Sequence, residues 1–256
     1  MKPVHALTPT LSGQVARGIC ALAVMTKAPQ AGQVKTRLVP PLTANEAAEL
    51  NKCFLLDTAA AISNTTTNCE ACGVAVYTPI GAESAYDDLL QTGFRLLPQR
   101  GTGFGDRLHY ATDDLFKSGF ASVCLIDSDS PTVPASSFSQ AVCKLADPGD
   151  RVVLGPCDDG GYYLIGLKKR HRELFTRIDW STEHVFKQTM DRAINLGLDV
   201  SLLPAGYDVD DADSLGRLCD ELLGGKSTST AEIALNTRRF LSKIVAHEGR
   251  DRIWPE

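Results

Sequence analysis

SVCLIDSDSP, residues 122–131, joins a short apolar run to two carboxylates and a proline. The apolar part, Ser122–Ile126, has the length and composition of a buried strand. In open α/β folds, a parallel strand delivers its last residues to the sheet edge where ligands bind. Pro131 cannot continue a central strand and stiffens the turn that follows. The stretch therefore predicts a strand of an α/β sheet that ends with Asp127 and Asp129 at a binding cleft.

Strand-like and helix-like segments alternate on both sides of this stretch. The strand-like segments are Ile19–Thr26, Gly73–Tyr77, Phe94–Leu97, Arg151–Leu154, Tyr162–Leu167 and Asp199–Leu203. The helix-like segments are Asp106–Lys117, Thr182–Leu196, Asp211–Leu223 and one that follows a capping box at Thr43-Ala-Asn-Glu46. This alternation predicts an α/β fold with a mostly parallel sheet and helices on both of its faces.

The sequence suggests one large domain with loosely attached ends. We expect a flexible N-terminal extension over 1–17, the main domain over 18–223, and a linker over 224–230, where the sequence is GGKSTST. Residues 231–256 carry apolar side chains at helical spacing, which predicts a C-terminal helix that docks on the domain.

Composition excludes several function classes. The 256 residues carry a net charge of −5 and no block of Lys and Arg, which gives a nucleic-acid partner little support. No apolar run approaches the roughly 20 residues of a membrane span, and no signal peptide is evident, so we expect a cytoplasmic protein. The eight cysteines are then expected to stay reduced. The oligomeric state is left open.

Asp127 and Asp129 are candidate metal ligands. Residues two apart in an extended chain point to the same side, so these carboxylates can approach one cation. Oxygen ligands of this kind suit Mg²⁺ or Mn²⁺ that is also bound to substrate phosphates. The alternative is structural: one aspartate caps a helix that begins near Ala135, and the other is solvated.

A basic loop follows the first strand. It contains Lys27, Gly32, Lys35 and Arg37 within KAPQAGQVKTR, residues 27–37. Glycine lets backbone N–H groups approach an anion and the cations add charge, so the loop is a candidate phosphate site. The spacing is not that of a Walker A loop, and a solvated basic loop is the alternative. A second glycine-rich loop precedes Asp106, which we expect to cap a helix.

Three later segments contain polar and aromatic candidates. DDGGYY, residues 158–163, reads as a hairpin turn, although its acids and Tyr162 could also form a sugar or acceptor pocket. Trp180 precedes a helix and is a candidate platform for a ring. The acids of 208–211 suit the start of the next helix, while Asp210 could reach a metal.

Taken in order, five segments resemble a known family: TKAPQAGQVKTRL, LIDSDSP, VVLGPCDDGGYYLIGL, WSTEHV and YDVDDADSL. The chain resembles the bacterial radical-SAM/selenodomain-associated, or arsenosugar-biosynthesis-type, glycosyltransferases. That family is similar to GT-A nucleotide-diphospho-sugar transferases and to molybdenum-cofactor and phospholactate guanylyltransferases. The resemblance implies a single GT-A-like domain over nearly the whole chain.

The resemblance also implies roles for particular residues. Lys27, Lys35 and Arg37 fall in the nucleotide-phosphate loop, Asp129 at the metal position, and Asp210 where related nucleotidyltransferases place a late metal contact. The sequence departs from the family in two places: at two positions of one motif, and in the glycine-rich loop before Asp106, which differs from the usual form. Many relatives have a non-acidic residue in place of Asp127 and a cysteine in place of Ser130, so the role of Asp127 is less defined than that of Asp129.

These observations lead to one main hypothesis and two alternatives. We predict a glycosyltransferase that uses Mg²⁺ or Mn²⁺ to move a sugar from a nucleotide-diphosphate donor to a small-molecule acceptor. Lys35 and Arg37 would hold phosphate oxygens, Asp159 would act as general base, and Tyr162 and Trp180 would line the acceptor or sugar pocket. The alternatives are a nucleotidyltransferase that releases pyrophosphate and a non-catalytic nucleotide-binding module.

Overall fold

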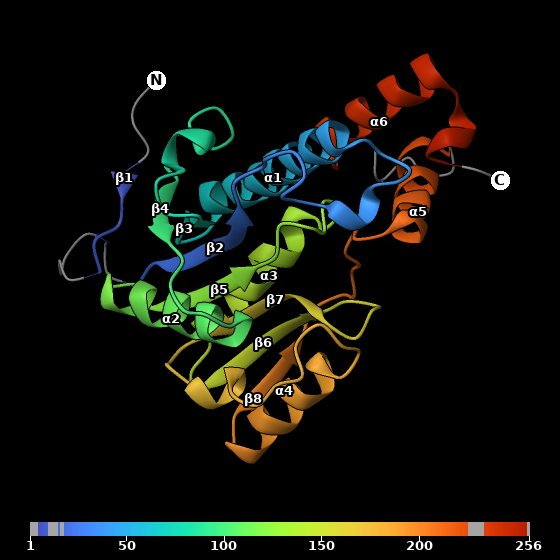
Figure 1. Cartoon of the computed structure of the whole chain (residues 1–256). Coiled ribbons are helices and arrows are strands. Elements are labelled where there is room, and N and C mark those ends of the chain that lie inside the picture. Colours follow the sequence, from blue (N-terminus) through green and yellow to red (C-terminus); the bar gives the residue numbers. More distant parts are fainter. Residues whose placement is uncertain (1–4, 10–14, 16–17, 225–232, 255–256) are drawn as a thin grey trace.

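A computed structural model describes residues 5–9, 15, 18–224 and 233–254. The described strands form one sheet in the order β1-β4-β3-β2-β5-β7-β6-β8 (Figure 1). They are β1 (His5–Ala6), β2 (Cys20–Lys27), β3 (Ala71–Thr78), β4 (Arg95–Pro98), β5 (Ser122–Ile126), β6 (Arg151–Pro156), β7 (Tyr162–Leu167) and β8 (Asp199–Leu202). Strand β7 runs antiparallel to β5 and β6, and the other described pairs are parallel. The predicted mostly parallel α/β sheet is confirmed.

Helices cover both faces of this sheet (Figure 1). The α-helices are α1 (Ala44–Asn68), α2 (Phe104–Lys117), α3 (Ala135–Ala146), α4 (Val185–Asn195), α5 (Ala212–Leu223) and α6 (Leu235–Glu248). Short 3₁₀ helices are η1 (Thr36–Leu38), η2 (Glu83–Tyr86), η3 (Arg172–Phe175) and η4 (Arg250–Arg252). In β2, Leu22 and Val24 pack with α1 and α3, whereas Ala21 and Ala23 pack with α2. Burial on both faces explains why this strand is almost wholly apolar.

The capping box predicted at Thr43 is present. The Thr43 side chain accepts a hydrogen bond from the Glu46 backbone N–H, and the Glu46 carboxylate accepts one from the Thr43 backbone N–H at 2.7 Å. Two other helix starts differ from expectation. Helix α2 begins at Phe104 after an uncapped Gly103, so Asp106 lies in the first turn and is not the cap. Helix α4 begins at Val185, because the Thr182 hydroxyl donates to the Asp179 carbonyl in a preceding turn.

A third apolar cluster joins α1, α5 and α6. Helix α6 begins after Ala234, which has a left-handed backbone (φ 52°) and no side chain that can cap. The cap comes instead from Asp57 of α1, which is buried. Its carboxylate accepts from the backbone N–H and side chain of Asn236 at 2.9 and 2.8 Å, and from those of Thr237 at 2.9 and 2.7 Å. The C-terminal helix is therefore fixed to the domain by a capping residue far away in the sequence.

The structure near the two ends of the chain can be compared with the expected domain boundaries. Strand β1 lies in the segment expected to be loosely attached, yet it pairs with β4, and the neighbouring Leu7 is buried. Of the expected linker over 224–230, only Gly224 lies within the described residues. All eight cysteines are free, and none of the described helices is long and apolar enough to cross a bilayer.

The capping of α6 by Asp57 can be tested with the substitution Asp57→Ala. Loss of an acceptor for two backbone N–H groups should destabilise the docked helix and lower the free energy of unfolding by about 1–3 kcal/mol. Hydrogen exchange should show faster exchange of the α6 amides. The exposed Asp88 provides the matched control Asp88→Ala, which should change neither measurement. Unchanged α6 protection in the Asp57 variant would contradict the capping role.

Candidate functional site

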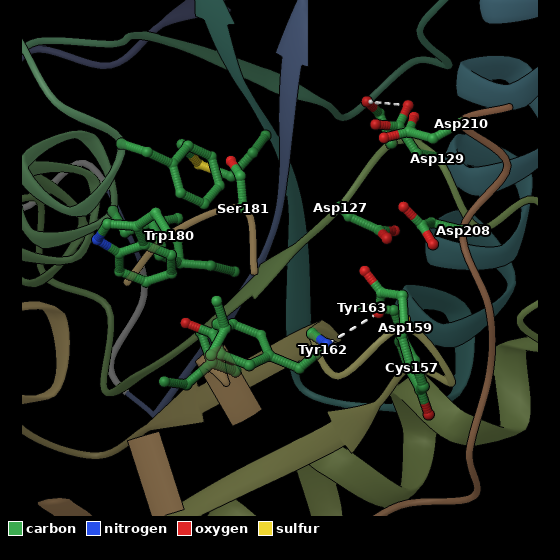
Figure 2. Close-up of a pocket in the computed structure, with 18 of the residues that line it drawn as sticks. Asp127, Asp129, Cys157, Asp159, Tyr162, Tyr163, Trp180, Ser181, Asp208 and Asp210 are labelled. Carbon is green, nitrogen blue, oxygen red and sulfur yellow. Dashed lines mark hydrogen bonds between the residues drawn. The ribbon is translucent and has the colours of Figure 1, made fainter. Parts of the chain in front are cut away.

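Four segments meet at the sheet edge where β2 and β5 end. They are the basic loop after β2, residues 127–131 after β5, the turn between β6 and β7, and residues 208–211 before α5. They surround a cavity of about 450 Å³, which we call the main cavity (Figure 2). This is the edge at which open α/β folds bind ligands.

Asp127 and Asp129 both line the main cavity, but their surroundings differ. The Asp127 carboxylate accepts a hydrogen bond from the Ser130 hydroxyl at 2.7 Å. Burial, and then the negative charge of Asp129, raise the pKa of Asp127 well above its ordinary value. Asp129 is instead ion-paired. Neither aspartate caps α3, whose N-cap is Pro134 without a side-chain cap, so the structural alternative of a helix cap is wrong.

Lys35 supplies the cation that pairs with Asp129. Its ammonium group lies 2.9 Å from Asp129 Oδ1 and 2.7 Å from Asp210 Oδ1, and donates to the Val209 carbonyl at 2.8 Å. The side chain is only 4% exposed, so these three acceptors engage the three donors of a buried group. A phosphate contact by Lys35 stays a prediction, and would require one of these bonds to be exchanged.

The loop before α5 contributes a second pair of aspartates, Asp208 and Asp210. Both line the main cavity, and the Val209 N–H between them donates to the Asp129 carbonyl at 3.0 Å. Burial, followed by the charges of Asp159 and Asp210, raises the pKa of Asp208 to about 6. The sequence analysis singled out Asp210 but missed Asp208. The spacing of two residues that marked Asp127 and Asp129 also occurs here and could have revealed it.

The turn between β6 and β7 confirms the predicted hairpin and places Asp159 at the main cavity. Asp159 is exposed, and its Oδ1 accepts from the Gly161 N–H at 2.8 Å. Gly160 packs against the backbone of Glu183, and the Phe186 N–H donates to the Gly160 carbonyl at 2.8 Å. The turn is therefore joined to the segment that precedes α4, and Glu183 also reaches the cavity.

Aromatic side chains form the opposite wall of the main cavity. Figure 2 shows Trp180 and Tyr162 across the pocket from the aspartates. Trp180 makes an edge-to-face contact with Phe104, with ring centroids 5.1 Å apart. Tyr162 lies on the sheet face of α2, whereas Tyr163 packs on the other face and donates to the Pro204 carbonyl. Phe104 was missed in the sequence, where the glycine-rich loop indicated only an exposed turn.

The basic loop borders a second cavity of about 280 Å³, which we call the basic cavity. Lys27 is exposed there and donates to the Gln33 carbonyl at 2.9 Å. Gly32 has a φ of +73° and open space at its Cβ position, but it lines neither the basic cavity nor the main cavity. Arg37 is exposed and lines both cavities. Within the described residues, no ion pair joins Arg37 to an acid, so this guanidinium is available to an anion.

The carboxylates partly match the predicted metal site. Within the described part of the chain, no three His, Cys, Asp or Glu side chains converge as a ready metal cage. Asp129 and Asp210 nevertheless direct one oxygen each to a single cation, the Lys35 ammonium. Mg²⁺ commonly needs only one or two carboxylates besides substrate phosphates and waters. The oxygens that meet at Lys35 are engaged by its ammonium, so a substrate-bridged Mg²⁺ or Mn²⁺ would have to use the other oxygens of Asp129 and Asp210. The roles of Asp127, Asp129 and Asp210 as metal ligands stay predictions.

Comparisons with known proteins agree with this fold. A family model described as "uncharacterized protein conserved in bacteria (DUF2064)" matches residues 62–182. A crystal structure from Desulfovibrio desulfuricans G20, described as a "putative nucleotide-diphospho-sugar transferase", is 26% identical, with a TM-score of 0.78 over 90% of this chain and 96% of that one. No protein with a curated description matches the chain.

A more distant structure shares the fold alone. CMP:2-keto-3-deoxy-manno-octonic acid synthetase in complex with CTP is 10% identical, with a TM-score of 0.51 over 81% of this chain and 99% of that one. The predicted fold of nucleotide-diphospho-sugar transferases is therefore confirmed. The arsenosugar-type resemblance stays a prediction.

The close contact between Gly160 in the β6–β7 turn and Glu183, before α4, can be tested with the substitution Gly160→Ala. Gly160 has a φ of +88°, and an added Cβ would lie 2.2 Å from the Glu183 carbonyl oxygen. Gly197→Ala is the matched control, because Gly197 also has a positive φ (+69°) but no described atom within 4 Å of its Cβ position. Urea unfolding should show Gly160→Ala to be the less stable by about 1–3 kcal/mol. Equal stabilities of the two variants would show that the Glu183 backbone moves away from the added Cβ at little cost in free energy.

Proposed function

We propose that the chain is a metal-dependent glycosyltransferase that moves a sugar from a nucleotide-diphosphate donor to a small-molecule acceptor. One observation carries the proposal: the basic cavity and the main cavity share Arg37, Asp129 and Asp210 along their border. A polyphosphate in the basic cavity would place the group attached to it in the main cavity. A diphosphate-linked sugar has this form.

The basic loop would hold the diphosphate. Arg37 offers a planar guanidinium that can bind two phosphate oxygens at once, and exposed Lys27 adds a second cation. Gly32 would contribute by letting the loop take the left-handed backbone angle that lies between these two cations in the sequence. In this proposal, Lys35 orients Asp129 and Asp210 through its ion pairs, and reaches phosphate only if those bonds rearrange.

Asp129 and Asp210 would hold Mg²⁺ or Mn²⁺, with Asp127 beside them. Such a cation neutralises charge on a departing diphosphate. The acceptor hydroxyl needs a proton acceptor, and we assign that role to Asp159. Its exposed carboxylate lies in the main cavity and is oriented by the hydrogen bond from the Gly161 N–H. Tyr162 and Trp180 would form the surface on which the acceptor or the sugar lies.

The finer family placement is also a proposal. The order of the five motifs supports membership in the radical-SAM-associated, arsenosugar-type branch. That branch is similar to guanylyltransferases as well as to sugar transferases, and the two reactions differ in the products that they release.

Product analysis tests the reaction. The full chain is incubated with nucleotide sugars, or with nucleoside triphosphates, in the presence of Mn²⁺, Mg²⁺ or EDTA. We expect slow hydrolysis of a nucleotide sugar to nucleoside diphosphate and free sugar, because water can replace a missing acceptor. EDTA should abolish it. Pyrophosphate from a triphosphate, with every nucleotide sugar intact, would establish nucleotidyl transfer instead. Binding without any turnover would indicate a non-catalytic module.

Arg37→Ala tests the phosphate site. A hydrogen-bonded charge of this kind contributes about 1.5–3 kcal/mol, so affinity for a nucleoside diphosphate should fall about 10- to 100-fold. Affinity for the free nucleoside should stay within about twofold, because the lost contact is to phosphate. Arg239→Ala, at an exposed position on α6, is the control and should bind both ligands normally. Calorimetric titration measures both. Equal losses for nucleoside and diphosphate would point to a structural role for Arg37.

A further inference from the structure

The main cavity has an unequal distribution of charge. Among the described residues that line it, one is a cation, Arg37, and six are acids: Asp127, Asp129, Asp159, Glu183, Asp208 and Asp210. In the proposed function Arg37 binds the donor diphosphate. Asp129 and Asp210 are paired with Lys35, and the raised pKa of Asp127 favours its neutral form. The carboxylates of the cavity that lack a paired cation in its described wall are therefore Asp159, Glu183 and Asp208.

The other cations of the site lie outside the main cavity. Lys27 and Lys35 line the basic cavity and are not part of the main cavity wall. Lys35 is in addition paired with two carboxylates, so it adds little positive field beyond them. The site is thus divided into a side that suits phosphate and a side that disfavours it.

The wall opposite the carboxylates is aromatic. Trp180 and Tyr162 face the aspartates across the cavity (Figure 2). The contact of Trp180 with Phe104 braces the indole, and Phe104 itself is 53% exposed. Aromatic faces of this kind bind flat apolar surfaces and attract cations through the ring quadrupole.

We infer that the acceptor carries no negative charge, presents a flat apolar face to Trp180 and Tyr162, and binds more tightly when it carries a positive charge. This inference rests on the proposed function, since it concerns the acceptor side of the same site. It excludes phosphorylated and carboxylated molecules as acceptors. An anion in this cavity would meet the carboxylates of Asp159, Glu183 and Asp208, which no cation of the described cavity wall compensates. An ammonium group would be attracted both by these carboxylates and by the aromatic rings.

Three small probes with the same ring test this preference. Tyramine is cationic, tyrosol is neutral and 4-hydroxyphenylacetate is anionic. Their binding to the full chain is measured by NMR titration with Mg²⁺ and either UDP or GDP. We expect tyramine to bind at least about tenfold more tightly than 4-hydroxyphenylacetate, with tyrosol between them. Added salt should narrow this ratio, because the discrimination is electrostatic.

Matched variants separate the charged wall from the aromatic wall. Glu183→Gln should narrow the tyramine to 4-hydroxyphenylacetate ratio about threefold, whereas Glu173→Gln, at an exposed position on η3, should not. Trp180→Leu should weaken all three probes about five- to tenfold without changing their order. Trp254→Leu, at the only other tryptophan of the sequence, should leave them unchanged. Melting temperatures near that of the wild type establish that each variant is folded.

The outcomes distinguish this inference from the proposed function. Binding of 4-hydroxyphenylacetate as tight as that of tyramine, or no binding of any probe, would overturn the inference. An equal effect of Glu183→Gln and Glu173→Gln would overturn it too. If the charge order holds while no nucleotide sugar is turned over, the proposed function fails and the preference of the cavity stands.

Discussion

One buried ammonium group, that of Lys35, holds the candidate site together. Burial alone lowers the pKa of a lysine, but the carboxylates of Asp129 and Asp210 outweigh it and leave the pKa of Lys35 above its ordinary value. The group is therefore charged and joins the end of β5 to the loop before α5. Removing either carboxylate would leave a buried charge without full compensation, which costs more than the pair itself contributes. The same contact sets the border between the two cavities, because Asp129 and Asp210 line both.

This contact also explains the backbone of the basic loop. Lys35 has a φ of 48°, in the left-handed region that long side chains seldom adopt. Its three hydrogen-bond acceptors specify that conformation, and η1 begins directly after it. As a result Arg37 emerges at the junction of the cavities and not within the ion pair. Two cations two residues apart thus have different roles, one internal and one available to a ligand.

Local patterns predicted the elements well, since their causes lie within a few residues. The capping box at Thr43 gave the start of α1, and the apolar run before Asp127 gave β5 and its sheet edge. Long-range partners could not be read from such patterns. Lys35 and Asp210 are 175 positions apart, and Asp57 caps a helix about 180 positions away. Asp208 was missed for a different reason: acids before a helix read equally well as caps, and only Asp211 is the cap.

The division of the site by charge follows from how the sheet is built. The basic loop follows β2, whereas Asp159 and Tyr162 come from the β6–β7 turn and from β7, on the other side of β5. Because β7 is antiparallel, its first residue lies at the same edge as the last residues of β2 and β5. Cations therefore reach the edge from one half of the sheet, and Asp159 and Tyr162 from the other, while Phe104 enters the aromatic wall from the start of α2, after β4. The residues at the junction, Asp129 and Asp210, stand where a phosphate–sugar bond would have to lie if both halves bind one substrate.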